Sequence, residues 1–498
     1  MASFFPHFFL SPPKKVTLRV CRDMACHLAG SARMLAELQL ISGAQVAIEG
    51  ASCLGRCDRA PAACVAVAGD HHEHYYLGRS LDELKNIVTA TLQAGPPAPD
   101  LDAGNGHRGG VSRISPYEAQ PDYAGVRKVI AARDASLGAA MESLRKNQTW
   151  DPMRLDQFRA NAIRQLRGDS QPDPDVIEAV RAWQVEIDWA KGQCIGGWAE
   201  AFFNEFNDAD LRGLGGAGIP VVQKWKDVRD AVRSLRRREE NDRAFIVVNG
   251  DESEPGTFKD REILLTNPYL VIEAVIIAGL LTEATQGFIY IRHEYAEQIE
   301  ACRKEIERAE QLGFCGPDAK ELGRPFPVSV FVSPGGYICG EQSALIEAMS
   351  DRRGEPRNMP PKLETNGLQD SPTLVSNVET FAWVPFICLK GGKAYAAEGV
   401  NTWKGRRLFS ISGDVKRPGV YEVPMGMTLR ELVHGDDYCQ GMADGRKLKA
   451  FAPSGPSGGF LPAKLKAGAG LPRDHVNNKA WQALAARRGF DPAATELD

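Results

Sequence analysis

The chain has no run of apolar residues close to the roughly 20 that a membrane-spanning helix needs, so its 498 residues predict no membrane span. It also has no excess of one charge, because 60 Lys and Arg stand against 64 Asp and Glu, a net charge of −4. Nucleic acids and anionic membrane surfaces attract basic proteins, so neither is expected as a partner. The apolar start, residues 4–10, is short, contains Pro6 and follows no basic segment. It is a poor signal peptide, and we expect a cytoplasmic protein.

A disulfide framework is not expected either. The cysteines number eleven, and an odd count in a large cytoplasmic chain favours free thiols and metal ligands. A hydrophobic content of 43% and a charged content of 25% are typical of a globular protein. The length is too great for one ordinary domain, so two to four domains are expected.

The first predicted domain covers residues 15–95. Its pattern predicts strands at residues 16–20 and 46–48, helices at 31–39 and 81–92, and a hairpin formed by 64–69 and 74–78. Residues 96–122 are rich in Pro, Gly, Asp and Asn, which predicts a linker.

The second predicted domain covers residues 123–400. Its first part has helical spacing, with Val180, Trp183, Ile187 and Trp189 expected in the core. Strands at 288–292 and 328–332 then alternate with helical segments such as 295–312. Alternation of this kind predicts an α/β fold with a mainly parallel sheet.

The third predicted domain covers residues 401–470. Strands at 407–413 and 419–423 would form a hairpin, Thr428 would cap a helix, and residues 449–453 would return as a strand before the glycine-rich run 454–459. This is a compact β-grasp pattern. Residues 471–498 are interpreted as an incomplete C-terminal segment.

Four cysteines in the first domain have the spacing of metal ligands. Cys21 and Cys26 form a C-x4-C pair, and Cys53 and Cys57 form a C-x3-C pair. Both pairs follow a predicted strand, so they can meet at one end of a sheet. Four thiolates can hold a [2Fe–2S] cluster. A zinc site is the alternative, although zinc favours C-x2-C pairs, and unligated core cysteines are the third interpretation.

A second group of residues suits a nucleotide cofactor. Gly213, Gly215, Gly216 and Gly218 would let the backbone approach a ligand closely, and Lys224 suits a phosphate. After the apolar run 245–248, an acidic loop begins at Asn249. Tight packing of a helix on a sheet would explain the glycines but neither the lysine nor the acidic loop.

These two motifs, together with residues 336–345, 353–357 and 372–380, closely resemble the flavin-binding subunit of respiratory NADH dehydrogenase. The resemblance covers residues 205–400 and extends to NAD-linked formate dehydrogenases and hydrogenases. The cysteine pattern resembles thioredoxin-like [2Fe–2S] ferredoxins, and the third domain resembles the SLBB β-grasp module. The expected fold is therefore α/β multidomain: a thioredoxin-like ferredoxin domain, an α/β FMN-binding domain and an SLBB-like domain.

The resemblance implies FMN, NAD and a [2Fe–2S] cluster as cofactors. It implies cofactor binding by Gly213, Gly215, Gly216, Gly218, Lys224, Asn249, Asp251, Glu252, Ser253, Glu254, Tyr337, Gly340, Glu341 and Asn377. Glu254, at the nicotinamide position, and Tyr337 are the expected catalytic residues. The implied activity exchanges hydride between NAD(H) and FMN and single electrons with iron–sulfur clusters, within a complex of several subunits.

The chain departs from the family pattern at several positions. Leu214 replaces Arg, Ile219 replaces Phe, Gln342 replaces Glu, Ser376 replaces Asn, and Met359–Lys362 replaces Lys-Pro-Pro-Phe. Loss of two stacking rings weakens dinucleotide binding, so a non-catalytic assembly or electron-relay subunit is the alternative hypothesis. The family's C-terminal [4Fe–4S] motif is also missing, so no such cluster is expected, whether the chain is a fragment or a homologue without it.

Overall fold

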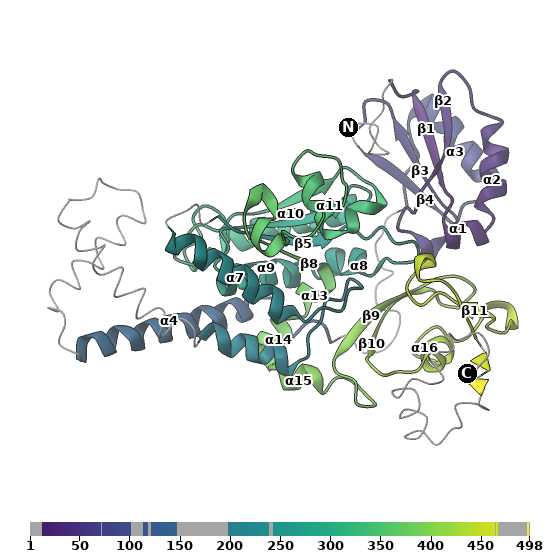
Figure 1. Cartoon of the computed structure of the whole chain (residues 1–498). Helices are drawn as coiled ribbons and strands as arrows, with labels where there is room; N and C mark the ends of the chain where they lie inside the picture. The colour runs from purple at the N-terminus through teal and green to yellow at the C-terminus, as the bar shows by residue number, and fades with distance from the viewer. Residues whose placement is uncertain are drawn as a thin grey trace.

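The computed structural model describes residues 12–70, 72–100, 113–117, 121–146, 198–238, 243–463, 465–466 and 496–497. We call β1 to α3 the N-terminal domain, α4 to α15 the central domain and β9 to β14 the C-terminal domain. Figure 1 shows the purple N-terminal domain and the yellow-green C-terminal domain on the same side of the central domain. The core residues predicted at Val180, Trp183, Ile187 and Trp189 lie outside the described residues.

The N-terminal domain is a four-stranded sheet of order β2-β1-β3-β4 with three helices. Strand β1 pairs in parallel with β2 and antiparallel with β3, and β3 and β4 form the predicted hairpin. The bounds are β1 (Val16–Cys21), α1 (Met24–Leu28), α2 (Ser31–Gln39), β2 (Val46–Ala51), β3 (Ala62–Val67), β4 (Glu73–Leu77) and α3 (Leu81–Ala94). All the predicted elements of this domain are confirmed within a few residues.

The central domain has a four-stranded sheet of order β7-β6-β5-β8, and all three of its strand pairs are parallel. The mainly parallel sheet expected from the sequence is therefore confirmed. The strands are β5 (Phe245–Gly250), β6 (Gln286–Arg292), β7 (Val328–Ser333) and β8 (Thr373–Asn377). The helices are α4 (Ala124–Lys146), α7 (Val221–Arg237), α8 (Lys259–Thr266), α9 (Pro268–Thr282), α10 (Ala296–Gln311), α11 (Gln342–Met349), α12 (Leu363–Asn366), α13 (Val378–Ala382), α14 (Val384–Lys390) and α15 (Gly392–Ala396).

Helix α9 forms the centre of the largest core. Every residue from Leu270 to Thr282 is buried, and the helix packs against β5 and β6 and against α4, α7, α10 and α13. In the described part of the chain, no single helix is long and apolar enough to cross a membrane. Helices α8 and α9 reach the length and composition of a span only together, and they are bent by 90° at their junction.

The C-terminal domain begins with the antiparallel hairpin of β9 (Arg406–Ile411) and β10 (Gly419–Pro424). Thr428 caps α16 (Leu429–His434) with a capping box, as predicted. The returning strand predicted at 449–453 is shorter, because β11 covers only Ala450–Phe451, and it pairs with β12 (Leu461–Pro462) instead of joining the first hairpin. Pro453 lacks the N–H that a longer ladder would need. The last pair is β13 (Leu465–Lys466) with β14 (Glu496–Leu497).

The described ends of the predicted linker lie against folded domains. The Asp100 carboxylate accepts hydrogen bonds from the Leu77 backbone (2.8 Å) and Arg79 (2.7 Å) of the N-terminal domain. At the other end, the backbone N–H groups of Arg113 and Ile114 donate to the Glu422 carboxylate on β10. The segment is therefore held at both of its described ends.

The same segment is joined to α9 by a buried carboxylate. Glu273 is 1% exposed and accepts hydrogen bonds from the Tyr117 hydroxyl at 2.7 Å and the Val126 backbone N–H at 3.1 Å. Burial raises the pKa of Glu273 to about 7, because the charged form is poorly solvated in the core.

The Glu273→Gln variant tests the buried environment of Glu273 through the pH dependence of the free energy of unfolding. A carboxyl group whose pKa rises on folding binds more protons in the folded state. Its contribution to stability is therefore complete below about pH 4.5 and is lost as the pH rises towards 7. This loss is at most about 3 kcal/mol. We expect the variant to show a smaller fall in the free energy of unfolding between pH 5 and 8, measured by urea unfolding. A Glu307→Gln control, at an exposed position, should keep the wild-type slope, and equal slopes in all three proteins would contradict the prediction.

Candidate functional site

The predicted site residues meet at the carboxyl edge of the central sheet. Asn249 and Asn377 are register partners on β5 and β8, and Asp251 follows directly after β5. Arg292 ends β6 and Ser333 ends β7. Ligands of parallel α/β sheets bind outside this edge of the sheet, so the fold brings the two predicted motifs to one place.

The glycine-rich loop forms a tight turn before α7. The Gly213 N–H donates to the Ile219 carbonyl (2.9 Å), and the Leu214 N–H donates to the Thr380 hydroxyl (2.8 Å). Gly216 has a φ of +115° and Gly218 a φ of +64°, and a Cβ added at either would meet nothing within 4 Å. The backbone of this loop therefore borders open space, which suits the close approach of a ligand.

On the other side, the loop touches β8. A Cβ added at Gly215 would lie 2.9 Å from the Cβ of Asn377. Any larger residue at this position would push the loop away from the sheet edge, which is a physical reason for the glycine.

Lys224 lies in the first turn of α7, close to this loop. Its Nζ donates to the Gln342 side-chain oxygen (2.7 Å) and to the Val375 carbonyl (3.2 Å), and both acceptors are neutral. Burial lowers the pKa of Lys224, because an ammonium group loses hydration there. The Glu364 and Glu341 carboxylates act on this cation only through space. Because its hydrogen bonds go to neutral acceptors, a phosphate group would add a direct contact with a negative charge.

Asn249, Asp251, Ser253 and Gly340 form one hydrogen-bonded group. The Asn249 amide donates to the Gly340 carbonyl (2.8 Å), and Asp251 accepts from Ser333 (3.0 Å) and from Ser253. Burial raises the pKa of Asp251 to about 6. These side chains hold each other in place beside the 3-10 turn at Tyr337–Gly340.

Glu252, a predicted cofactor-binding residue, is held by hydrogen bonds within the protein. Its carboxylate accepts from the backbone N–H groups of Asp260 (2.9 Å) and Arg261 (3.1 Å) at the start of α8, and from the Tyr295 hydroxyl (3.2 Å). Burial raises the pKa of Glu252 to about 7. Both of its oxygens accept hydrogen bonds from the protein itself, so the residue holds the acidic loop in place.

Glu341 and Asn377 also cap helices. Glu341 accepts from the Ser343 and Ala344 N–H groups at 3.0 Å at the start of α11. Asn377 accepts from the Glu379 N–H at 3.0 Å at the start of α13. Asn377 also donates from Nδ2 to Asp260 (2.6 Å) and accepts at Oδ1 from Lys259 (3.3 Å). Its contribution to a cofactor site would come from its second amide hydrogen, and that of Glu341 from its other carboxylate oxygen.

The two predicted catalytic residues are in direct contact. The Tyr337 hydroxyl donates to one Glu254 oxygen at 2.5 Å, and this hydrogen bond raises the pKa of Tyr337. The other Glu254 oxygen accepts from the backbone N–H (3.1 Å) and hydroxyl (2.7 Å) of Ser457. Ser457 belongs to the C-terminal domain and was missed from the sequence, although the glycine-rich run around it was a visible signal.

The four predicted metal ligands also come together. Cys21, Cys26, Cys53 and Cys57 are at most 5% exposed, and the sulfurs of Cys53 and Cys57 are 3.4 Å apart. Hydrogen bonding with Cys26 raises the pKa of Cys21, and hydrogen bonding with Cys21 lowers the pKa of Cys53. Four thiols in one buried pocket are the donor set of a [2Fe–2S] cluster.

The second cysteine loop docks on the central domain. Arg292 donates to the Cys53 carbonyl (2.7 Å), and Arg261 donates to the Gly55 carbonyl and pairs with Asp58 (3.2 Å). The backbone N–H of Gly256, two residues after Glu254, donates to the Cys57 sulfur at 3.3 Å. The four-cysteine pocket therefore lies against the acidic loop of the predicted cofactor site.

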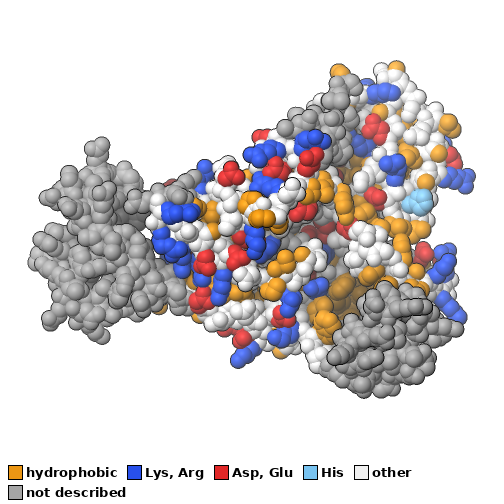
Figure 2. Space-filling model, in the orientation of Figure 1, with side chains coloured by type: hydrophobic (Ala, Val, Ile, Leu, Met, Phe, Trp, Pro, Cys, Tyr) orange, Lys and Arg blue, Asp and Glu red, His pale blue; other side chains and the backbone are white. Residues whose placement is uncertain are grey.

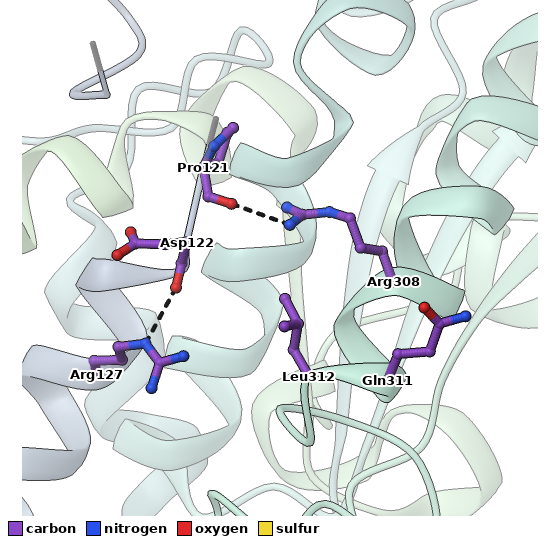
Figure 3. Close-up of a pocket in the computed structure, with 6 residues that line it drawn as sticks. All are labelled: Pro121, Asp122, Arg127, Arg308, Gln311 and Leu312. Carbon is purple, nitrogen blue, oxygen red and sulfur yellow. Dashed lines mark hydrogen bonds between the residues drawn. The ribbon is translucent and has the colours of Figure 1, made fainter. Parts of the chain in front are cut away.

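The described surface has a hollow between the domains and another hollow away from the predicted site residues. Figure 2 shows a hollow where the domains meet, with Asp and Glu side chains inside it. A second hollow, of about 410 Å³, lies beside α4 and α10 and is shown in Figure 3. Its two arginines donate to backbone carbonyls, Arg127 to Asp122 (3.2 Å) and Arg308 to Pro121 (3.0 Å). We assign no ligand to it.

Comparison with known families agrees with these sites. Residues 1–90 match the thioredoxin-like [2Fe–2S] ferredoxin model, residues 206–386 the Nuo51 FMN-binding domain, and residues 408–435 the SLBB domain. Each of the three domains is therefore similar to the family whose model it matches. These matches confirm the resemblance, the fold class and the expected FMN and [2Fe–2S] cofactors, and they favour the cluster over zinc.

Similar proteins cover part of the chain. It is 43% identical over 253 residues to the F subunit of NADH-quinone oxidoreductase from Aquifex aeolicus, which is 50% of this chain and 56% of the relative. It is 38% identical over 254 residues to the HndC subunit of NADP-reducing hydrogenase from Solidesulfovibrio fructosivorans, 51% of this chain and 50% of the relative. The chain thus spans little more than half the length of these relatives. Air-oxidised NAD⁺-reducing [NiFe]-hydrogenase matches with a TM-score of 0.65 at 25% identity, over 93% of this chain and 67% of that chain.

The cysteine assignment predicts a selective loss of iron. Reconstitution with iron and sulfide should give a [2Fe–2S] absorbance spectrum in the wild-type chain and in a Cys64→Ala control. Cys64 is also fully buried in this domain but lies within β3. The Cys53→Ser variant should lose most of the bound iron, because one thiolate ligand is missing. Equal iron and sulfide contents in the two variants would show that the assignment is wrong.

Proposed function

We propose that this chain is an electron-transfer flavoprotein subunit of a larger oxidoreductase complex. It exchanges hydride between NAD(H) and FMN, and single electrons with iron–sulfur clusters. The observation that supports this most strongly is the hydrogen bond from Gly256 to the Cys57 sulfur, because it joins the four-cysteine pocket to the loop of the flavin site. Bound FMN supplies the conversion between two-electron and one-electron transfer.

Each part of the flavin site has a distinct proposed role. The backbone of the loop from Gly213 to Gly218 approaches the cofactor, and Lys224 binds its phosphate. Asn249, Asp251, Ser253 and Gly340 hold the ribityl chain and the ring, and Glu341 and Asn377 border them. The support is the open space above the glycines and the neutral partners of Lys224.

NAD(H) binding is proposed at the part of the site where Glu254 and Tyr337 lie. Glu254 and Tyr337 contact the nicotinamide part, and Tyr337 is 53% exposed. Ile219 and Met359, which replace family residues, are 43% and 53% exposed. Their apolar surface supports contact with the flat rings of a dinucleotide, although an aliphatic side chain contributes less than a stacked ring.

A second candidate function is an assembly or electron-relay subunit that has lost dinucleotide binding. It is favoured by the absence of an aromatic ring at Ile219 and by Lys362, which stands where the family has Phe. This candidate shares the fold and the cluster with the first but predicts that NADH leaves the bound flavin oxidised.

The setting of the protein is also proposed. Its partners are subunits that carry iron–sulfur clusters. It works in the cytoplasm, and if the complex is membrane-bound, this subunit is a peripheral part of it. The domain boundaries that we propose are residues 15–95, 96–122 for the linker, 123–400, 401–470, and 471–498 for the terminal segment.

An anaerobic titration separates the two candidate functions. The full chain is reconstituted with FMN and with iron and sulfide, and NADH is added stepwise. We expect the flavin absorbance to bleach and the absorbance of the cluster to fall. Flavin that binds but stays oxidised would favour the relay subunit, and a chain that binds no flavin would refute the main proposal.

Replacement of Lys224 tests the phosphate contact. A hydrogen bond from a charged donor contributes about 1.5–3 kcal/mol, so Lys224→Met should raise the Kd for FMN by about 10-fold to 100-fold. Riboflavin, which lacks the phosphate, should bind both proteins alike, as measured by flavin fluorescence. The matched control is Lys226→Met on the same helix, because Lys226 pairs with Glu200 at 2.7 Å. An FMN affinity unchanged by Lys224→Met would contradict the assignment.

A further inference from the structure

The C-terminal domain reaches the predicted nicotinamide site through one short turn. Strands β11 and β12 pair antiparallel, with Phe451 opposite Leu461, and the residues between them form the tip of this hairpin. We call Gly455–Gly458 the Ser457 turn. Figure 1 shows it in yellow, where the C-terminal domain meets the purple and teal parts of the chain.

The turn fits tightly against Glu254. A Cβ added at Gly455 would lie 2.2 Å from the Glu254 oxygen Oε1, so only glycine fits there without displacing one of the two. The same oxygen accepts both the N–H and the hydroxyl of Ser457. These contacts span 203 residues of sequence, so the C-terminal domain fixes the direction of a side chain on the central domain.

Within the described part of the chain, the hydrogen bonds leave one acceptor position of the carboxylate open. A carboxylate can accept about four hydrogen bonds, two on each oxygen. Ser457 fills both positions on Oε1, and Tyr337 fills one on Oε2. One position on Oε2 remains, which suits a neutral N–H donor such as a carboxamide.

We infer that Ser457 is a positioning residue for Glu254, and that the C-terminal domain thereby completes the nicotinamide side of the site. This inference rests on the proposed function. By occupying Oε1, the Ser457 turn directs the free position of Oε2 towards the carboxamide of the nicotinamide ring. The adenosine and diphosphate parts of the dinucleotide gain nothing from this contact.

The inference predicts that changes in the turn affect NAD⁺ but not ADP-ribose, which lacks nicotinamide. Both are measured as competitive inhibitors of NADH oxidation by the FMN-loaded full chain with ferricyanide as acceptor. Ser457→Ala removes one of the two donors to Oε1 and should weaken NAD⁺ about fivefold. Gly455→Ala displaces the turn or the carboxylate and should weaken NAD⁺ at least tenfold. ADP-ribose should change less than twofold in both, and Ser457→Thr should restore NAD⁺ binding.

Gly459→Ala is the matched control for backbone strain. Gly455 and Gly459 have nearly equal φ angles, +73° and +76°, but a Cβ at Gly459 would meet nothing within 4 Å. Both substitutions therefore carry the same conformational penalty, and only Gly455→Ala touches Glu254. FMN content and NAD⁺ binding of Gly459→Ala should match the wild-type chain.

The outcomes of this experiment are distinct. Selective loss of NAD⁺ binding supports the inference. An equal loss of NAD⁺ and ADP-ribose would show a general structural role and overturn it, as would unchanged binding of both. A wild-type chain that holds FMN but binds neither inhibitor would instead refute the proposed NAD(H) function, and the inference with it.

Discussion

Three buried arginines hold the N-terminal domain on the central domain, and the arrangement of the four-cysteine pocket and the predicted flavin site depends on them. Arg292 forms a two-point ion pair with Glu294 while also donating to the Cys53 carbonyl. Arg261 pairs with Asp58, and the Arg56 guanidinium lies over the rings of Tyr75 and Tyr295. A buried charge that loses its partner is strongly destabilising. The second cysteine loop therefore has little freedom to shift relative to the acidic loop.

The acidic loop is fixed from within by two buried carboxylates. Glu252 caps α8 and receives the Tyr295 hydroxyl, while Asp251 is held by two serines. Burial raises the pKa of both groups, which indicates a poorly hydrated environment around the loop. Preorganised groups in such an environment interact more strongly with a bound ligand than they would in water. Glu254, from the same loop, contacts both Tyr337 of the central domain and Ser457 of the C-terminal domain.

Local patterns in the sequence were enough for most of the architecture. Alternation of strands and helices predicted the parallel sheet, and the cysteine spacing predicted a buried four-thiol pocket. What the sequence did not show concerns the direction of side chains and long-range pairing. Glu252 follows Asp251 directly, and nothing in the local pattern shows that it turns to the start of α8. The contact of Ser457 with Glu254 and the pairing of β11 with β12 arise from tertiary packing, which a motif search cannot see.

The predicted linker between the first two domains, residues 96–122, has a kinetic consequence. Its described ends are fastened, one by Asp100 to the N-terminal domain and the other by Glu422 to β10. The two domains are also packed together through buried contacts, so the proposed centres stay adjacent at any dilution of the protein. Electron exchange between them would therefore be first-order. A separate electron carrier of similar shape in solution would have to compete with an N-terminal domain that is already bound.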